Sequence, residues 1–454
     1  MVPGMPLKSL RPLAVPAVVS LMLLGATPAL AGSKPDEQKL DEPAVVGVDN
    51  ETPVLYDDEE GGNASGDDPA IWVHPEDSAL SIVIVTAKEG GLRVYDLDSS
   101  ELQSLEATPA PRVDGVDGRY NNVDIAHDVM FQGQEVDVAV VSDRYNDQLR
   151  FFLIDPAGAE AAAPLREVTA PQQAFLFNPD RAAVDEEHTA YGVAVWQPSA
   201  DETYAVVTQE GDTTIATARL VETGGGLGYE QIEPLEMPAS FPLPDRTTWT
   251  PCEEPGVGPH LEGLSVDQRT DVLYAAQEDV GLWRVPLPLG SGEPRLVDKV
   301  ADFGVHDTYN PETEECEPND PEAGGYGGDL LTADAEGVDV YYGPDREGYV
   351  IVSSQGDDTY AVYSTLPRNR PLGSFRVAGD GVDDLNGSDG LTVTNRSVGE
   401  YDEGLLVSHD EPETGPDVDA ERDATNFSYV SWGAVADSMG LLVSTRAGND
   451  PRFR

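Results

Sequence analysis

One short strand pattern recurs six times along the chain of 454 residues, and it limits the fold more than any other feature of the sequence. Each copy begins with a polar residue and continues with small or apolar residues at every second position, which is typical of a strand. The copies start at Asp68 (DPAIW), Asn121 (NNVDI), Tyr191 (YGVAV), Glu262 (EGLSV), Glu336 (EGVDV) and Asp389 (DGLTV). Successive copies lie between 53 and 74 residues apart.

A second, more apolar strand follows each copy roughly twenty residues later and ends in a polar residue. These ends are Lys88, Arg144, Gln209 with Glu210, Glu278, Gln355 and Asp410. A multi-strand unit that cannot bury its own faces and is repeated in this way predicts a propeller. We therefore predict an all-β, six-bladed β-propeller over residues 61–454, with helical periodicity only at 432–442.

The propeller fold brings equivalent residues of the six copies together. The first strand of each blade lines the central channel, so the six starting residues are expected to converge on one face of it. The ends of the second strands are expected to form another ring just outside. Turn formation alone would not require Asp and Glu at these positions, because Asn, Ser or Gly would serve.

The inner ring is rich in carboxylates, with Asp67 beside Asp68 and Asp334 two residues before Glu336. Such a cluster requires bound cations or raised pKa values, because like charges repel. No histidine occupies an inner-ring position, so oxygen ligation of Ca²⁺ or Mg²⁺ is favoured over zinc or copper. Several calcium ions could bind phosphate oxygens and lower the pKa of a water molecule that attacks phosphorus.

Basic side chains stand beside these carboxylates at equivalent strand ends. Arg144 can bind phosphate oxygens with two N–H groups and Lys88 as a point charge. Ordinary salt bridges account for the two residues equally well. Tyr191 could donate a hydrogen bond to phosphate or simply pack in the channel.

Charge excludes some partners. The chain has 27 Lys and Arg against 84 Asp and Glu, a formal net charge of −57. Such a polyanion repels nucleic acids and anionic membranes. Solubility, adaptation to a salty habitat and cation binding all remain explanations of this acidity.

The N-terminus has the features of an export signal at residues 1–31. Lys8 and Arg11 precede a mostly apolar run that is too short to span a membrane, and small residues follow at 29–31. We expect a secreted protein that begins near Gly32. In an exported protein, a single disulfide between Cys252 and Cys316 is the simplest interpretation of two cysteines.

Stretches of the sequence resemble the β-propeller phytases of bacteria, also called alkaline phytases or 3-phytases. They run in that family's order from about residue 60 to 440 and include DDPAIWVHP (67–75), TAKEGGLRVYDL (86–97), NNVDI (121–125), VSDR (141–144), YGVAV (191–195), EGLSV (262–266), QEDVGLW (277–283), DAEGVDVYYG (334–343), GYVIVSSQGDDTYAVY (348–363) and SDGLTV (388–393). The resemblance implies a calcium-dependent hydrolase that removes phosphate from phytate, the hexakisphosphate of inositol. It also implies several Ca²⁺ ions in and around the channel. Because the chain has a net charge of −57, we expect it to take the polyanion phytate as its calcium salt, and we expect a monomer.

The resemblance assigns roles to individual residues. Those expected to hold catalytic calcium or phosphate are Asp67, Asp68, Tyr191, Glu262, Glu278, Glu336 and Asp383. Lys88 and Arg144 would bind phosphate, and Asp334, Gln355 and Asp389 would support calcium sites, with Gln355 also near the substrate. Among these, the catalytic set is Asp68, Lys88, Tyr191, Glu262 and Glu336.

Two positions depart from the family's pattern. Gln209 and Glu210 stand where a lysine is common, and Ala126 stands where an arginine is common. We expect both changes to remove substrate contacts, so that substrate binding is weaker or shifts towards contacts mediated by calcium.

Three further segments surround the repeats. Residues 32–60 form an N-terminal segment, in which the stretch from Pro43 to Leu55 is a candidate outer strand that closes the ring. The acidic loops at 302–329 and 411–425 look like additions to the core. Each cysteine lies shortly before the first strand of adjacent copies, which would place both on the same face.

Two other functions remain open at this stage. A calcium-binding propeller without activity, such as an adhesion module, would need the carboxylates but not Lys88, Arg144 and Tyr191. A propeller lactonase would hold one buried metal with few carboxylates and would not need phosphate-binding cations.

Overall fold

A computed structural model describes residues 42–57, 63–112, 115–160, 163–313, 315–379, 382–414, 418–419 and 422–453. The expected export signal at 1–31 lies outside these residues. Within the described part of the chain, no helix has the length and apolar character needed to cross a membrane.

The first three repeats each form a four-stranded antiparallel sheet in chain order. The first sheet contains β4 (Pro69–Trp72), β5 (Ile82–Thr86), β6 (Leu92–Tyr95) and β7 (Glu101–Leu105). The second contains β8 (Tyr120–Phe131), β9 (Gln134–Asp143), β10 (Gln148–Ile154) and β11 (Leu165–Glu167). The third contains β12 (Ala190–Ser199), β13 (Glu202–Gln209), β14 (Thr214–Thr223) and β15 (Gly226–Glu236).

The last three repeats follow the same plan. The fourth sheet contains β18 (Leu261–Asp267), β19 (Val272–Gln277), β20 (Gly281–Pro286) and β21 (Arg295–Leu296). The fifth contains β24 (Ala335–Tyr341), β25 (Tyr349–Ser354), β26 (Thr359–Ser364) and β27 (Pro371–Ala378), and the sixth contains β28 (Leu391–Thr394), β29 (Leu405–Asp410) and β30 (Ala424–Ser431).

Helices are short and lie between or after the sheets. The α-helices are α1 (Pro156–Glu160), α2 (Arg181–Val184) and α3 (Trp432–Met439), and α3 confirms the helical periodicity predicted near the C-terminus. Single 3₁₀ turns occur at η1 (Ser78–Leu80), η2 (Arg144–Asn146), η3 (Pro344–Arg346), η4 (Gln355–Asp357) and η5 (Ala447–Asn449).

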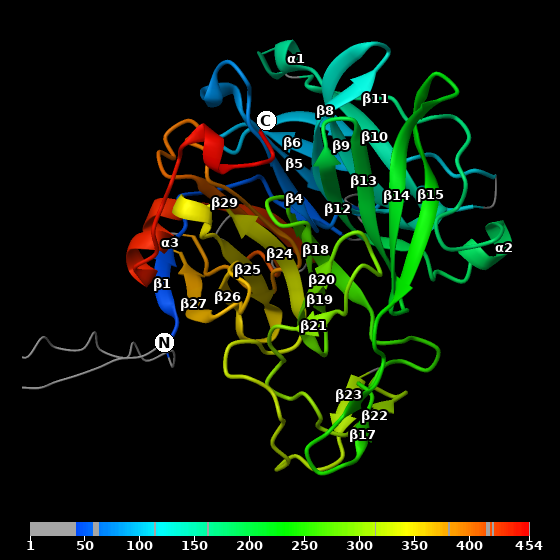
Figure 1. Cartoon of the computed structure of the whole chain (residues 1–454), viewed down its shortest axis with the longest axis vertical. Coiled ribbons are helices and arrows are strands. Elements are labelled where there is room, and N and C mark those ends of the chain that lie inside the picture. Colours follow the sequence, from blue (N-terminus) through cyan, green and yellow to red (C-terminus); the bar gives the residue numbers. More distant parts are fainter. Residues whose placement is uncertain are drawn as a thin grey trace, which may run out of the picture. The chain divides into compact units, whose positions relative to one another are not determined.

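The six sheets are arranged as a six-bladed β-propeller, which confirms the predicted fold. The first strands contact one another in a closed cycle, from β4 through β8, β12, β18, β24 and β28 back to β4. Figure 1 shows β4, β12, β18 and β24 gathered around the centre, with the blades following one another in the order of the colour bar. Each predicted starting residue lies at the beginning of such a strand, so the repeat derived from the sequence is the blade.

The core consists of apolar layers between neighbouring blades. Val83 and Val85 of β5 pack with Leu405 and Phe427 of the sixth blade, which joins the last blade to the first. Because both faces of each sheet are covered, the second strands have no polar face, as in the fully buried IVIVT of β5. Burial on both faces explains why these strands are more apolar than an alternating pattern would require.

The N-terminal segment adds outer strands to two blades. β1 (Ala44–Gly47) pairs in parallel with β27, and β2 (Asn50–Glu51) and β3 (Leu55–Tyr56) pair with β30. The fifth and sixth blades therefore take their outermost strands from the start of the chain.

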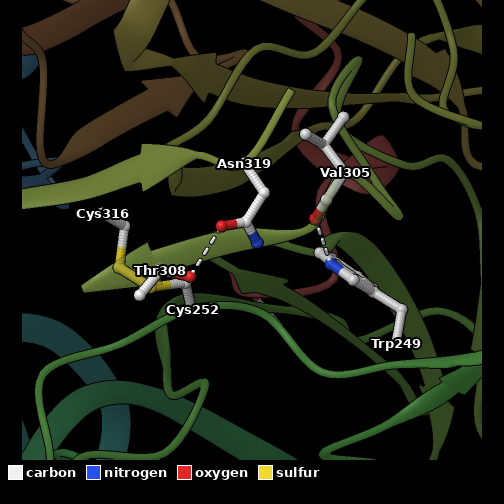
Figure 2. The surroundings of a disulfide bond; sticks show 6 residues. All are labelled: Trp249, Cys252, Val305, Thr308, Cys316 and Asn319. Carbon is white, nitrogen blue, oxygen red and sulfur yellow. Dashed lines mark hydrogen bonds between the residues drawn. A yellow bond between two sulfur atoms is a disulfide. The ribbon is translucent and has the colours of Figure 1, made fainter. Parts of the chain in front are cut away.

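A small extension accompanies the fourth blade. It comprises the pair β16 (Phe241–Pro242) and β17 (Thr248–Trp249) and the hairpin of β22 (Asp307–Asn310) and β23 (Glu315–Pro318). A disulfide joins Cys252 to Cys316, with 6.0 Å between their Cα atoms, and ties this hairpin to the segment that leads into β18. Figure 2 shows the bond beside two hydrogen bonds, from Trp249 to the carbonyl of Val305 and from Thr308 to Asn319.

Candidate functional site

A bulge at the start of the first strand presents the ring residues to the channel mouth. The pairing of β8, β12, β18 and β24 with their second strands skips two residues at the same place in each blade. The skipped residues include Asn121, Tyr191, Glu262 and Glu336. A bulge redirects side chains that would otherwise alternate between the faces of the sheet.

Glycines after the ring residues allow the blades to approach closely. A Cβ atom on Gly192 or Gly263 would clash with the backbone carbonyl of the ring residue in the next blade. The same holds for Gly337 against the carbonyl of Asp389. Glycine is required here because backbone meets backbone, and this contact sets the spacing of the ring.

Three glutamates form the acidic centre of the site. Carboxylate oxygens of Glu262, Glu278 and Glu336 lie within 4.8 Å of one another. Asn121 donates a hydrogen bond of 2.7 Å to Glu262, and Oε2 of Glu336 is buried without a partner. Burial, followed by the charges of Glu278 and Glu262, raises the pKa of Glu336 well above its ordinary value. Burial also raises the pKa of Glu278 to about 7.

Lys88 contacts a second pair of carboxylates at the ring. Its Nζ is 3.3 Å from Oδ2 of Asp389 and 3.9 Å from Oδ2 of Asp67. Burial would lower the pKa of Lys88, but the charges of Asp67 and Asp389 outweigh it and raise that pKa. Gln355 donates a hydrogen bond of 2.8 Å to the other oxygen of Asp389. Lys88 is therefore a fixed cation between the first and sixth blades.

Arg144 and Tyr191 stand together on the side of the second and third blades. The guanidinium of Arg144 lies over the Tyr191 ring, 5.2 Å from its centre. Burial and then the charges of Glu262 and Glu278 raise the pKa of Tyr191 well above its ordinary value, so its hydroxyl keeps its proton. Glu210 forms an ion pair with Arg144.

Asp68 has a structural contact that the sequence did not indicate. Its Oδ2 accepts a hydrogen bond of 3.0 Å from the backbone N–H of Val123 in the second blade. Asp124 and Asp339 make the same contact with the first strands of the third and sixth blades. These three carboxylates line a small cavity in the channel, of about 40 Å³, and their hydrogen bonds join neighbouring blades there.

Asp383 lies in a different acidic cluster from the ring glutamates. Glu51, Asp383, Asp410 and Glu413 place carboxylate oxygens within 4.8 Å of one another. Glu51 comes from β2, so the N-terminal segment contributes a carboxylate to this cluster. Oxygens of Glu51, Asp383 and Asp410 are buried without hydrogen-bond partners. The structure therefore places Asp383 in a second candidate metal site. Its assignment to the catalytic calcium stays a prediction.

Two histidines beside the ring were missed. Nε2 of His260 lies 3.0 Å from Glu278. His260 stands two residues before Glu262 in the sequence, so considering the residues next to each ring position would have found it. Burial would lower the pKa of His260, but Glu278 more than offsets this and raises it to about 10. His409 accepts a hydrogen bond from the backbone N–H of Asp389, and burial lowers the pKa of His409 to about 4. The site therefore contains one cationic and one neutral imidazole.

Of the remaining predicted residues, Asp334 and Gln209 lie at the ring and Ala126 does not. Asp334 stands beside the ring, where burial and the charges of Asp389 and Glu262 raise its pKa, although His260 lowers it. Gln209 donates to the carbonyl of His188 at the end of β13. Ala126 is fully buried in the core with Val129 and Val138, five residues along β8 from Asn121. The expectation that Ala126 replaces a substrate contact is wrong, because this position faces the core between the blades.

The residues at the ring fit a hard divalent cation. Oδ1 of Asp67 and Oε2 of Glu336 are buried without partners, and burial raises both pKa values, as expected where a positive charge is needed. Clustered carboxylate oxygens with no thiol are the donor set that calcium and magnesium prefer.

Comparison with known proteins identifies the family. The Phytase family model matches residues 12–227 and 308–453, more than half of the chain. The 3-phytase of Bacillus subtilis (strain 168) is 28% identical over 399 residues, which cover 86% of this chain and 85% of that protein.

Two solved structures show low similarity to this chain. The crystal structure of the major Malassezia sympodialis allergen Mala s 1 has a TM-score of 0.39 and 11% identity, over 77% of this chain and 89% of its own. A Lactobacillus plantarum protein has a TM-score of 0.35 and 13% identity, over 64% and 66%. The family match covers more than half of the sequence and shows that the chain belongs to the phytase family.

Proposed function

We propose that this protein is a secreted, calcium-dependent phosphatase that hydrolyses the phosphate monoesters of phytate. Membership of the phytase family supports a phosphatase that acts on phytate. The observation that carries the proposal is the meeting, at one mouth of the channel, of clustered carboxylates with Lys88, Arg144 and Tyr191.

Calcium is the cofactor we propose. The ring would hold it through Asp67, Asp68, Glu262, Glu278, Asp334, Glu336 and Asp389, and the second cluster through Glu51, Asp383, Asp410 and Glu413. When bound, calcium would offset the repulsion among these carboxylates, contact phosphate oxygens and lower the pKa of water in the site. It would also explain how a chain with a net charge of −57 accepts a polyanion, and why the calcium salt of phytate is the expected substrate.

The chain's own side chains bind and orient the phosphate. Lys88 supplies a fixed positive charge to an oxygen of the phosphate group. The Tyr191 hydroxyl, which keeps its proton, can donate a hydrogen bond to another oxygen. Arg144, stacked on that ring, can bind a phosphate through two N–H groups. Gln355 orients Asp389 beside Lys88.

These contacts disfavour the two other functions considered. An adhesion module would not require Lys88, Arg144 and Tyr191 to face the carboxylates, and a lactonase would not require phosphate-binding cations. Export through residues 1–31 and a monomeric state belong to the same proposal and rest on the sequence.

The experiment compares the wild type with Glu336→Gln, which removes one charge from the ring with little change in shape. We expect the variant to bind calcium more weakly at equilibrium and to release phosphate from phytate at least about 100-fold more slowly. Glu230→Gln, which removes a carboxylate from an ion pair with Arg219 outside the ring, is the matched control. Equal rates in the wild type and Glu336→Gln would refute the proposed role of the ring.

A further inference from the structure

Among the described residues, three lysine and arginine side chains at the ring are each paired with a carboxylate of the chain itself. Lys88 lies against Asp389 and Asp67, Arg119 against Glu89, and Arg144 against Glu210. Asp389 and Asp67, the partners of Lys88, are proposed calcium ligands. Glu89 and Glu210 lie outside both carboxylate clusters, so their contacts with the arginines need another explanation.

Arg119 belongs to the same row of cations as Lys88 and Arg144. Its backbone carbonyl accepts a hydrogen bond of 2.7 Å from the N–H of Arg144. The next residue, Tyr120, donates its N–H to the carbonyl of Lys88 over 3.1 Å. The charge of Arg119 also acts to lower the pKa of Lys88.

The two arginines are held so that the tips of their guanidinium groups meet the carboxylates. Nε of Arg119 and Nε of Arg144 are buried without hydrogen-bond partners, whereas their terminal nitrogens contact Glu89 and Glu210. All four side chains are between 15% and 21% exposed, so solvent reaches the pairs. Arg144 is also fixed from below by the ring of Tyr191. The part of each arginine that would bind a phosphate is therefore already occupied.

A carboxylate and a phosphate offer arginine the same pair of acceptor oxygens. We propose that Glu210 and Glu89 are internal competitors of the substrate, which occupy Arg144 and Arg119 until a phosphate group displaces them. The proposal rests on the proposed function and concerns how the same site selects its substrate. Binding must break an ion pair for each arginine used, so the two glutamates lower the affinity for phosphate groups and favour a substrate that engages both arginines at once.

A double-mutant cycle tests the competition between Glu210 and the substrate. Glu210→Gln keeps the shape of the side chain and frees Arg144, so we expect KM for phytate to fall about fivefold with kcat nearly unchanged. In an Arg144→Gln background, the same substitution should change KM less than about twofold, because no arginine remains to be freed. Glu89→Gln should lower KM in the same direction through Arg119.

The controls separate this effect from a general change of charge. Glu230→Gln breaks the ion pair with Arg219 on the same sheet as Glu210 and should leave KM unchanged. Thermal unfolding of each variant verifies that it folds. An equal fall in KM with and without Arg144 would overturn the proposal in favour of simple repulsion between Glu210 and the substrate. An unchanged or higher KM in Glu210→Gln would overturn it as well.

A second readout keeps this test independent of catalysis. Inositol hexasulfate has the same inositol scaffold as phytate, with sulfate esters in place of phosphate esters. Its affinity, measured by calorimetry, should rise in Glu210→Gln by a similar factor. If the wild type releases no phosphate from phytate, the proposed function fails. In that case, tighter sulfate binding would still support the competition, and unchanged binding would overturn it too.

Discussion

Removal of the calcium proposed for the cluster of Glu51, Asp383, Asp410 and Glu413 is expected to make the fold less stable as the pH rises. Asp410 is fully buried at the end of β29, with one oxygen hydrogen-bonded to the N–H of Asn386 and the other without a partner. Burial is the main cause that raises its pKa from 3.8 to about 8, and the charges of Asp383 and Glu413 add to it.

The sign and size of the effect follow from that shift. Between pH 4 and pH 8, the folded protein without calcium keeps a proton on Asp410 that the unfolded chain has lost. Stability is then greatest below the unfolded pKa and falls as the pH rises towards the folded pKa. Each pH unit costs at most about 1.4 kcal/mol for one group, so the loss between pH 5 and pH 8 is at most about 4 kcal/mol.

Urea unfolding of the calcium-free protein in excess EDTA, at pH 5 and at pH 8, measures this loss of stability directly. We expect a lower midpoint at pH 8 in excess EDTA, and a much smaller difference with millimolar calcium, which binds only the folded cluster. Asp410→Asn should remove part of this pH dependence in excess EDTA, and the rest stays because other buried carboxylates, such as Glu278 and Glu336, also have raised pKa values. Two results would show that Asp410 does not hold a proton in the folded, calcium-free protein: a wild type as stable at pH 8 as at pH 5 in excess EDTA, or an Asp410→Asn variant with the same loss as the wild type.

Three further predictions follow from the ring and the disulfide. Lys88→Gln should lower kcat/KM for phytate by about 100-fold, since it removes the fixed cation, and the Lys88→Arg variant should recover part of the rate. Gly263→Ala should lower the free energy of unfolding by about 3 kcal/mol or more, because its Cβ would clash with the next blade, whereas Gly324→Ala, with open space around it, should be neutral in the same denaturant titration. Cys252→Ser opens a loop of 64 residues and should cost up to about 4 kcal/mol in guanidinium unfolding, while phosphate release continues.

The ring could be predicted from the sequence because it depends on repetition. The bulge recurs at the same place in four of the blades, and the close backbone contact at Gly192, Gly263 and Gly337 in three of them. The residue types repeat there as well, as in the Glu-Gly pairs at Glu262 and Glu336. A propeller converts equivalent sequence positions into neighbours in space, so this register was sufficient to place Lys88 and Arg144 beside the carboxylates.

Contacts outside the repeat could not be predicted in this way. Glu51 and Asp410 are far apart in the sequence and lie close together in space because β2 pairs with β30. No local sequence pattern predicts that pairing. The ion pair of Arg144 with Glu210 depends on the rotamers of two long side chains from neighbouring blades. Ala126 was misplaced because a match in sequence order does not reveal which face of a long strand a residue occupies.

Phosphate release from phytate by the purified protein is the most direct test of the central claim. The measurement compares millimolar calcium with excess EDTA at the same pH and ionic strength. We expect release with calcium, almost none with EDTA, and recovery when calcium is restored. Full activity in excess EDTA would contradict the calcium-dependent mechanism, and no release in either condition would reduce the ring to a cation-binding surface.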